Sequence, residues 1–109
     1  MLQETATGAR ILAAVVCGIM PPAMADTIRI EAKGLTFEPA EVSAHVGDTI
    51  EWTNSDFVAH TATARNRDWD IVLPPHSMRQ MALKKPGDIE YYCRFHPAMK
   101  GKISAGMTK

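Results

Sequence analysis

The stretch that decides the fold reads Tyr91-Tyr92-Cys93-Arg94-Phe95-His96-Pro97-Ala98-Met99-Lys100-Gly101. Cys93 ends a predicted strand, and His96 and Met99 follow at equal spacings of three residues in a predicted loop. A tight loop of this kind can turn a thiolate, an imidazole and a thioether toward one point. The thioether discriminates between metals, because copper accepts it whereas zinc gains little from it. The stretch therefore predicts a copper site where a strand ends.

A blue-copper site consists of two histidines, one cysteine and a weak axial methionine, so a second histidine must come from elsewhere in the chain. His60 is the best candidate, because it follows the predicted strand 50–54 in a polar, irregular stretch that could lie beside Cys93. Taken alone, His60 would be interpreted as a surface histidine. We expect His45 and His76 at the surface, because His45 is out of phase with the inward residues of its strand and His76 follows two prolines.

The chain after residue 25 has the pattern of an all-β protein. Apolar and polar residues alternate with a period of two, and Gly and Pro interrupt the runs. The predicted strands cover 27–32, 35–37, 41–46, 49–53, 77–83, 88–93 and 100–105, whereas 54–75 is irregular with one or two short strands. No window shows a sustained helical stripe. This punctuated alternation is typical of a sandwich or a barrel.

The first 25 residues are predicted to be a secretory signal peptide. Arg10 precedes the apolar run 11–20, which is followed by a proline-rich stretch and then by Ala23-Met24-Ala25. This order matches the basic segment, apolar core and small-x-small cleavage site of exported proteins, and the apolar run is shorter than the about 20 residues that span a bilayer. An uncleaved anchor or a misplaced start codon is the alternative. We expect cleavage before Asp26 and one domain over 26–109.

The cysteine content and the charge narrow the function. The chain has two cysteines, and only Cys93 lies after the expected cleavage site. Exported proteins usually pair their cysteines in disulfides, so a single one is a free thiol, an intermolecular partner or a metal ligand. A formal net charge of zero, from 12 basic and 12 acidic side chains, argues against a general nucleic-acid binder. It also gives no reason to expect electrostatic docking on a membrane.

Together these residues resemble the cupredoxins, and within that family the amicyanin-like branch. The resemblance covers nearly all of 26–109, and its markers are 37–39, 46–54, His60 and 91–101. The spacing of Cys93, His96 and Met99 matches the short ligand loop of amicyanin rather than the longer loops of plastocyanin, pseudoazurin and azurin. The fold that this resemblance implies is a Greek-key β-sandwich.

The resemblance implies one type 1 copper ion, with His60, Cys93 and His96 as strong ligands and Met99 as a long axial ligand. It implies a monomeric periplasmic carrier of single electrons, which pass through the edge of His96. By analogy, an amine dehydrogenase would be the donor and a c-type cytochrome the acceptor. Copper storage or delivery is the alternative. An enzyme is not expected, because an oxidase or nitrite reductase needs a further catalytic copper, for which this chain lacks the length and the histidines.

The resemblance also gives roles to residues around the ligands. Asn54 is expected to tie the two ligand segments together by a side-chain hydrogen bond to the backbone near Cys93, or else simply to end a strand in a turn. Phe95 stands where family members often carry proline, and its additional N–H is predicted to donate to the Cys93 sulfur. Tyr91 is expected to be either a tyrosine corner or a cross-strand packing residue.

Overall fold

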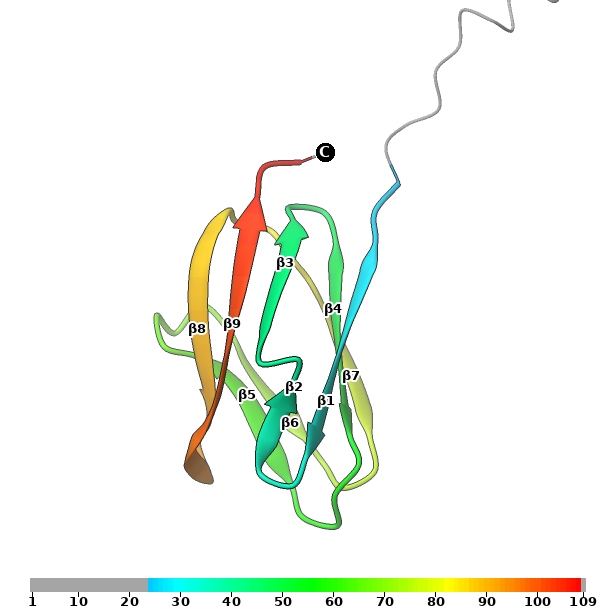
Figure 1. Ribbon diagram of the computed structural model, residues 1–109, viewed down its shortest axis with the longest axis vertical. Helices are drawn as coiled ribbons and strands as arrows, with labels where there is room; N and C mark the ends of the chain where they lie inside the picture. Colours follow the sequence, from blue (N-terminus) through cyan, green and yellow to red (C-terminus); the bar gives the residue numbers. More distant parts are fainter. Residues whose placement is uncertain (1–23, 109) are drawn as a thin grey trace, which may run out of the picture.

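The two sheets of the molecule face each other and contain nine strands within residues 24–108, the part of the chain that the computed structural model describes (Figure 1). One sheet has the order β2-β1-β4-β7, and the other has the order β3-β9-β8-β5-β6. The strands are β1 (Thr27–Lys33), β2 (Thr36–Glu38), β3 (Glu41–His45), β4 (Thr49–Asn54), β5 (His60–Ala64), β6 (Asp70–Leu73), β7 (Met78–Ala82), β8 (Gly87–Cys93) and β9 (His96–Gly106). The predicted all-β Greek-key sandwich is confirmed.

The core lies between the sheets and is built from the alternating positions of the strands. In the first sheet, β1 and β4 run parallel, and Ile30 lies opposite Trp52, both of them buried. In the second sheet, β8 contributes Tyr91 and Cys93 to the same interior, and β9 contributes Ile103. The candidate ligand Cys93 is therefore part of the core, held by the packing of both sheets.

Tyr91 is a packing residue at the centre of this core. Its ring makes an edge contact with Phe37 at 4.8 Å between centroids and with Trp52 at 5.6 Å. Its hydroxyl has no hydrogen-bond partner among the described residues, so the tyrosine-corner alternative is not supported. Burial raises the pKa of Tyr91 to about 12, and the neighbouring indole N–H of Trp52 opposes this rise.

The irregular stretch predicted over 54–75 contains two strands, β5 and β6. All five residues of β5 are buried, and this strand lies inside the second sheet between β6 and β8. Buried on both faces, β5 shows no alternation, and its sequence of one histidine, two threonines and two alanines lacks the large apolar residues that mark a core strand. The two threonine hydroxyls of β5 are satisfied by hydrogen bonds to each other, to the Arg94 amide and to the Asp70 carboxylate.

The predicted loop after Cys93 is wrong in its extent, because β9 begins at His96 rather than at residue 100. Cys93 pairs directly with His96, so only Arg94 and Phe95 form the turn of the β8–β9 hairpin, next to a register shift between Tyr92 and Cys93. His96 and Met99 therefore lie on a strand. A strand restricts their backbone more than a free loop would, which favours a fixed ligand geometry.

The predicted signal peptide, residues 1–25, lies almost entirely outside the described residues, which begin at Met24. Within the described part, no helix is long and apolar enough to cross a membrane.

Candidate metal centre

Three of the four predicted ligands converge at one end of the sandwich. The nitrogen atoms of His60 and His96 and the sulfur of Cys93 all lie within 4.8 Å of one another. The Cys93 Sγ is 3.8 Å from the His60 Nδ1 and 3.8 Å from the His96 Nδ1. Both imidazoles thus turn the same kind of nitrogen toward the thiol, across a common central point.

The fold brings these residues together from three strand ends. His60 begins β5, Cys93 ends β8 and His96 begins β9. Because β5 and β8 are antiparallel neighbours, the start of one lies beside the end of the other, although 33 residues separate the two ligands. This end of the molecule is the lower end in Figure 1, where the β8–β9 turn and the segment before β5 lie.

The ligand atoms have the spacing and chemistry that one transition-metal ion requires. Ligand atoms bound to one ion at about 2.0–2.3 Å lie roughly 3–4 Å from one another, and both sulfur–nitrogen distances of 3.8 Å fall in this range. Two imidazoles and a thiolate in a trigonal arrangement are the strong ligands of a type 1 copper site. Met99 is buried three residues after His96, with 1% of its surface exposed. The residues present therefore fit a single copper ion.

The imidazole of His60 is held in one orientation by Asp56. The His60 Nε2–H donates to the Asp56 Oδ2 at 2.7 Å, which leaves the Nδ1 lone pair facing the sulfur. This hydrogen bond, and then the Gly34 amide, hold the pKa of Asp56 below its ordinary value, so the carboxylate is the stable form. A carboxylate on the outer nitrogen of a ligating histidine fixes its tautomer and raises its basicity. Asp56 is not among the residues predicted from the sequence, although its position four residues before His60 was a signal.

The hydrogen bond to the Cys93 sulfur comes from Thr61 rather than from Phe95. The Thr61 amide donates to the Cys93 Sγ at 3.3 Å. The described residues contain no bond from the Phe95 amide to this sulfur, so that prediction is wrong. Phe95 lies in the hairpin turn with 52% of its surface exposed, and the guanidinium of Arg94 lies 5.5 Å above its ring.

The tie between the two ligand segments is also made by Thr61, and not by Asn54 as predicted. The Arg94 amide donates to the Thr61 Oγ1 at 2.8 Å, which connects the residue after Cys93 to the residue after His60. The Asn54 amide instead donates to the carbonyl oxygens of Val58, Leu73 and Pro74. Asn54 therefore ends β4, as the alternative prediction had it, and fixes the segment before His60 to the end of β6.

The Thr61 hydroxyl continues into a directed chain of hydrogen bonds. The Thr63 hydroxyl donates to the Asp70 Oδ1 at 2.7 Å, so the 2.9 Å bond between the two threonines must be donated by Thr61. The Arg94 Nε also donates to the Asp70 Oδ1, at 3.1 Å, which returns the chain to the β8–β9 turn. Both threonine hydroxyls of this chain are satisfied. The turn between Cys93 and His96 is held through the backbone amide and the side chain of Arg94.

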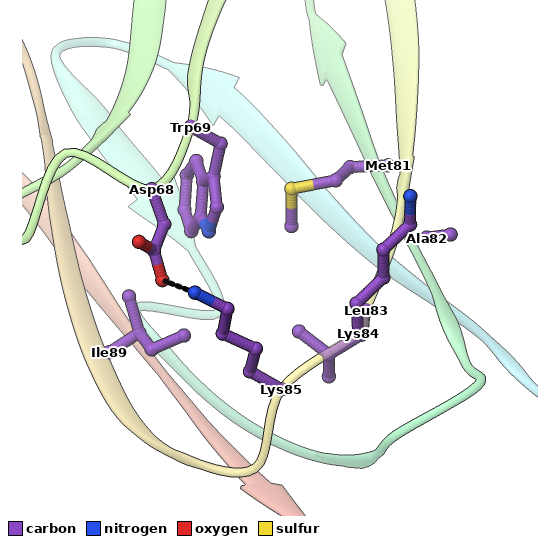
Figure 2. Close-up of a pocket in the computed structure, with 8 residues that line it drawn as sticks. All are labelled: Asp68, Trp69, Met81, Ala82, Leu83, Lys84, Lys85 and Ile89. Atoms are coloured by element: carbon purple, nitrogen blue, oxygen red, sulfur yellow. Dashed lines mark hydrogen bonds and ion pairs between the residues drawn. The ribbon is translucent and has the colours of Figure 1, made fainter.

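The remaining histidines and the described hollows lie apart from the ligands. His45 and His76 are exposed, which confirms their expected surface positions. Figure 2 shows a hollow whose walls include Trp69, Met81 and Ile89, with the Lys85 amine turned toward the Asp68 carboxylate at 3.3 Å. None of the four candidate ligands lines this hollow.

Comparison with known proteins agrees with this geometry. Amicyanin-alpha of Methylorubrum extorquens is 27% identical over 98 residues, which cover 84% of this chain and 82% of that protein. A purple cupredoxin from Nitrosopumilus maritimus superposes with a TM-score of 0.65 at 22% identity, covering 72% of this chain and 99% of the other. Amicyanin from Paracoccus versutus superposes with a TM-score of 0.63 at 22% identity, covering 78% and 84%.

The family model described as the cupredoxin-like domain matches residues 8–105. This match spans most of the chain and includes His60, Cys93, His96 and Met99. The chain therefore belongs to the cupredoxin-like family.

Proposed function

We propose that this protein is a periplasmic carrier of single electrons that uses one copper ion held by His60, Cys93, His96 and Met99. The observation that carries the proposal is the convergence of two imidazole nitrogens and one thiol sulfur, each nitrogen 3.8 Å from the sulfur, in a chain of the cupredoxin-like family. When bound, copper supplies reversible one-electron chemistry between Cu(II) and Cu(I). The rest of the function belongs to the protein's own residues.

The first task of these residues is to keep the ligands from moving. Asp56 holds the His60 ring, the Thr61 amide holds the Cys93 sulfur, and the Thr61 hydroxyl holds the turn that leads to His96. Each of these groups is partly or wholly buried, so water does not compete freely with the hydrogen bonds. A site fixed in this way changes little between oxidation states, which keeps the reorganisation cost of electron transfer low.

The second task is to provide one edge through which electrons pass. His60, Cys93 and Met99 are buried, whereas His96 is half-buried at the start of β9. Around His96, the hairpin exposes Phe95, Pro97 and Ala98. An apolar rim of this size suits the small, transient interfaces of redox encounters. We infer that electrons enter and leave through the His96 edge.

The family resemblance supports a proposed location and proposed partners. A cleaved peptide over residues 1–25 would place the domain 26–109 in the periplasm, where we propose that it acts as a monomer. The similarity to amicyanin-alpha supports an amine dehydrogenase as electron donor and a c-type cytochrome as acceptor, by analogy of fold and site. The protein itself is not proposed to be an enzyme.

Repeated redox cycling of the copper-loaded protein tests the carrier function. One equivalent of reductant should bleach the visible thiolate-to-copper band completely, and one equivalent of oxidant should restore it, with fast electron self-exchange by NMR. Copper should leave only slowly when a chelator is added. Rapid loss of copper together with slow self-exchange would contradict the carrier function and support copper delivery.

A further inference from the structure

A buried carboxylate lies at the opposite end of the sandwich from the metal centre. Asp48 belongs to the turn between β3 and β4, and only 2% of its surface is exposed. Its Oδ2 accepts the His45 amide at 2.9 Å, and the His45 Nδ1 lies 3.9 Å from the same oxygen. Its Oδ1 accepts the backbone N–H of Asp26 at 2.9 Å. The carboxylate thus joins the β3–β4 turn to the segment that enters β1.

Asp26 is held at both of its backbone groups. Its N–H donates to Asp48, and its carbonyl oxygen accepts the Thr49 amide at 2.9 Å, directly before β1 begins at Thr27. Met24 and Ala25 are both exposed, Met24 with 76% of its surface. Figure 1 shows this segment leaving the upper end of the sandwich, away from the β8–β9 turn. The bond predicted to be cleaved by the signal peptidase, Ala25–Asp26, therefore lies where the chain passes from exposed residues to residues fixed by the fold.

We propose that cleavage of this bond turns the Asp26–Asp48 hydrogen bond into an ion pair that locks the mature N-terminus. Hydrolysis by a secretory signal peptidase adds water across the Ala25–Asp26 amide. The Ala25 carbonyl carbon gains the hydroxyl and becomes a carboxylate, and the Asp26 nitrogen becomes an α-ammonium. This nitrogen already lies 2.9 Å from the Asp48 Oδ1, so one N–H of the ammonium takes the place of the amide N–H without movement of the chain.

The ion pair stabilises the processed protein more than the amide bond stabilises the precursor. A charge-assisted hydrogen bond is roughly twice as strong as a neutral one. The buried Asp48 carboxylate also gains a neighbouring positive charge, which offsets the cost of keeping it away from water. The exposed carboxyl of Asp26 and the half-exposed ring of His45 are the other titratable groups that we identify beside the pair. Cleavage before Ala25 would leave the Asp26 nitrogen as a neutral amide, and cleavage after Asp26 would remove it.

Mass measurement and a double-mutant cycle test this proposal on the exported, copper-loaded protein. The full chain is expressed with its own leader, and the intact mass of the secreted product should correspond to a chain that begins at Asp26. A second version carries one extra alanine between Ala25 and Asp26, so that processing after Ala25 leaves a neutral amide at the Asp26 nitrogen. Asp48→Asn is introduced into both versions, and urea unfolding is measured for all four proteins.

We expect Asp48→Asn to lower the folding equilibrium constant of the native processed protein by about fivefold to tenfold more than that of the alanine-extended protein, the difference between a charge-assisted and a neutral hydrogen bond. Equal losses in the two backgrounds would overturn the ion pair. A secreted product that begins elsewhere would overturn the cleavage site.

If the Asp48→Asn proteins fail to fold, the native processed protein is compared with the alanine-extended protein, both of which keep Asp48. The native processed protein must then have the higher urea midpoint, and equal midpoints would refute the proposal. The copper band should be the same in every folded version, which separates this test from that of the metal centre.

Discussion

Thr61 contacts the metal centre twice although it is not a candidate ligand. Its amide bonds the Cys93 sulfur and its hydroxyl accepts the Arg94 amide, so one residue holds the sulfur and the turn that follows it. It is fully buried beside His60. The backbone amide is unaffected by most substitutions, so the two roles of Thr61 can be separated experimentally.

Thr61→Ala should destabilise the protein while leaving the copper colour in place. The Arg94 amide would lose its acceptor, at a cost of about 1–3 kcal/mol for an unsatisfied buried group, and the Thr63 hydroxyl would keep only its bond to Asp70. The amide bond to the sulfur would remain. Urea unfolding measures the loss, and Thr61→Ser, which keeps the hydroxyl, is the matched control. If the alanine and serine variants unfold alike, the hydroxyl does not hold the turn.

Asp56→Asn should weaken copper binding by about 10- to 100-fold, as loss of a carboxylate partner of a ligating histidine typically does. An asparagine side chain carries no negative charge, so its hydrogen bond with the His60 N–H would orient the ring less firmly. Competition with a copper chelator measures the affinity. Asp68→Asn, which changes an exposed carboxylate that does not contact a ligand, serves as the control. Equal affinities of the two variants would show that Asp56 does not support the site.

Asp70 should make a pH-dependent contribution to stability. The Thr63 hydroxyl, and then Arg94, hold the pKa of Asp70 below the ordinary value of 3.8. A carboxyl with a lowered pKa in the folded state stabilises the fold above the unfolded value, and this contribution is lost as the pH falls through the folded value. Asp70→Asn should therefore lower the unfolding midpoint at neutral pH, and the difference from the native protein should shrink as the pH falls from 3.8 through the lower pKa that Asp70 has in the folded state. A difference that is constant from neutral to acidic pH would contradict this assignment.

At the level of strands, the β8–β9 hairpin determines the geometry of the site. Its short turn places Cys93 opposite His96, and the packing of Tyr91 on β9 holds the two strands together behind the ligands. Gly101 is required for this packing, because a Cβ at this position would lie 2.5 Å from the Tyr91 ring. The ring is fixed by Phe37 and Trp52, so it cannot move aside.

Gly101→Ala should destabilise the protein by about 1–3 kcal/mol, as overpacking of a core does. Gly106→Ala is the matched control in the same strand, since its nearest contact would be the His45 Cδ2 at 3.4 Å. Thermal or urea unfolding of both variants measures the difference. If the two glycine variants are equally stable, the approach of Tyr91 does not limit residue 101.

Strands with one exposed face were predictable from the sequence, and strands buried on both faces were not. β1, β3 and β4 alternate between buried and exposed positions, so their period of two is visible. β5 is buried throughout and contains threonines, whose burial depends on hydrogen bonds with partners far along the chain. The extension of β9 to His96 was also missed, because the residues after Cys93 were expected to form a ligand loop, with the last strand beginning at residue 100.

The ligand spacing was readable from the sequence because three of the four candidates belong to one motif. Their hydrogen-bond partners were not, because they depend on register between strands. Thr61 reaches Cys93 only because β5 pairs with β8. Asn54 ends β4 in one sheet and reaches the carbonyls of Leu73 and Pro74, at the end of β6 in the other sheet. In the folded protein, Thr61 therefore makes the two contacts predicted for Asn54 and Phe95, which are the tie between the ligand segments and the hydrogen bond to the Cys93 sulfur.

The whole molecule keeps its two specialised regions at opposite ends of the sandwich. The candidate ligands lie where β5, β8 and β9 meet, and the Asp26–Asp48 contact lies where β1 and β4 begin (Figure 1). Substitutions at sites that are far apart and share no partners usually have additive effects on stability. Combining Asp48→Asn with Thr61→Ala should therefore reduce the free energy of unfolding by the sum of the single effects, and a clear departure from additivity in urea unfolding would reveal coupling between the two ends.

The most direct test of the central claim is titration of the purified, metal-free protein with Cu(II). The account predicts an intense visible thiolate-to-copper band that grows linearly and saturates at one copper per chain. The band should be absent from Cys93→Ser and retained in His76→Ala, a histidine outside the site. A colourless protein at saturation, or a band that survives in Cys93→Ser, would contradict the claim that His60, Cys93, His96 and Met99 hold copper.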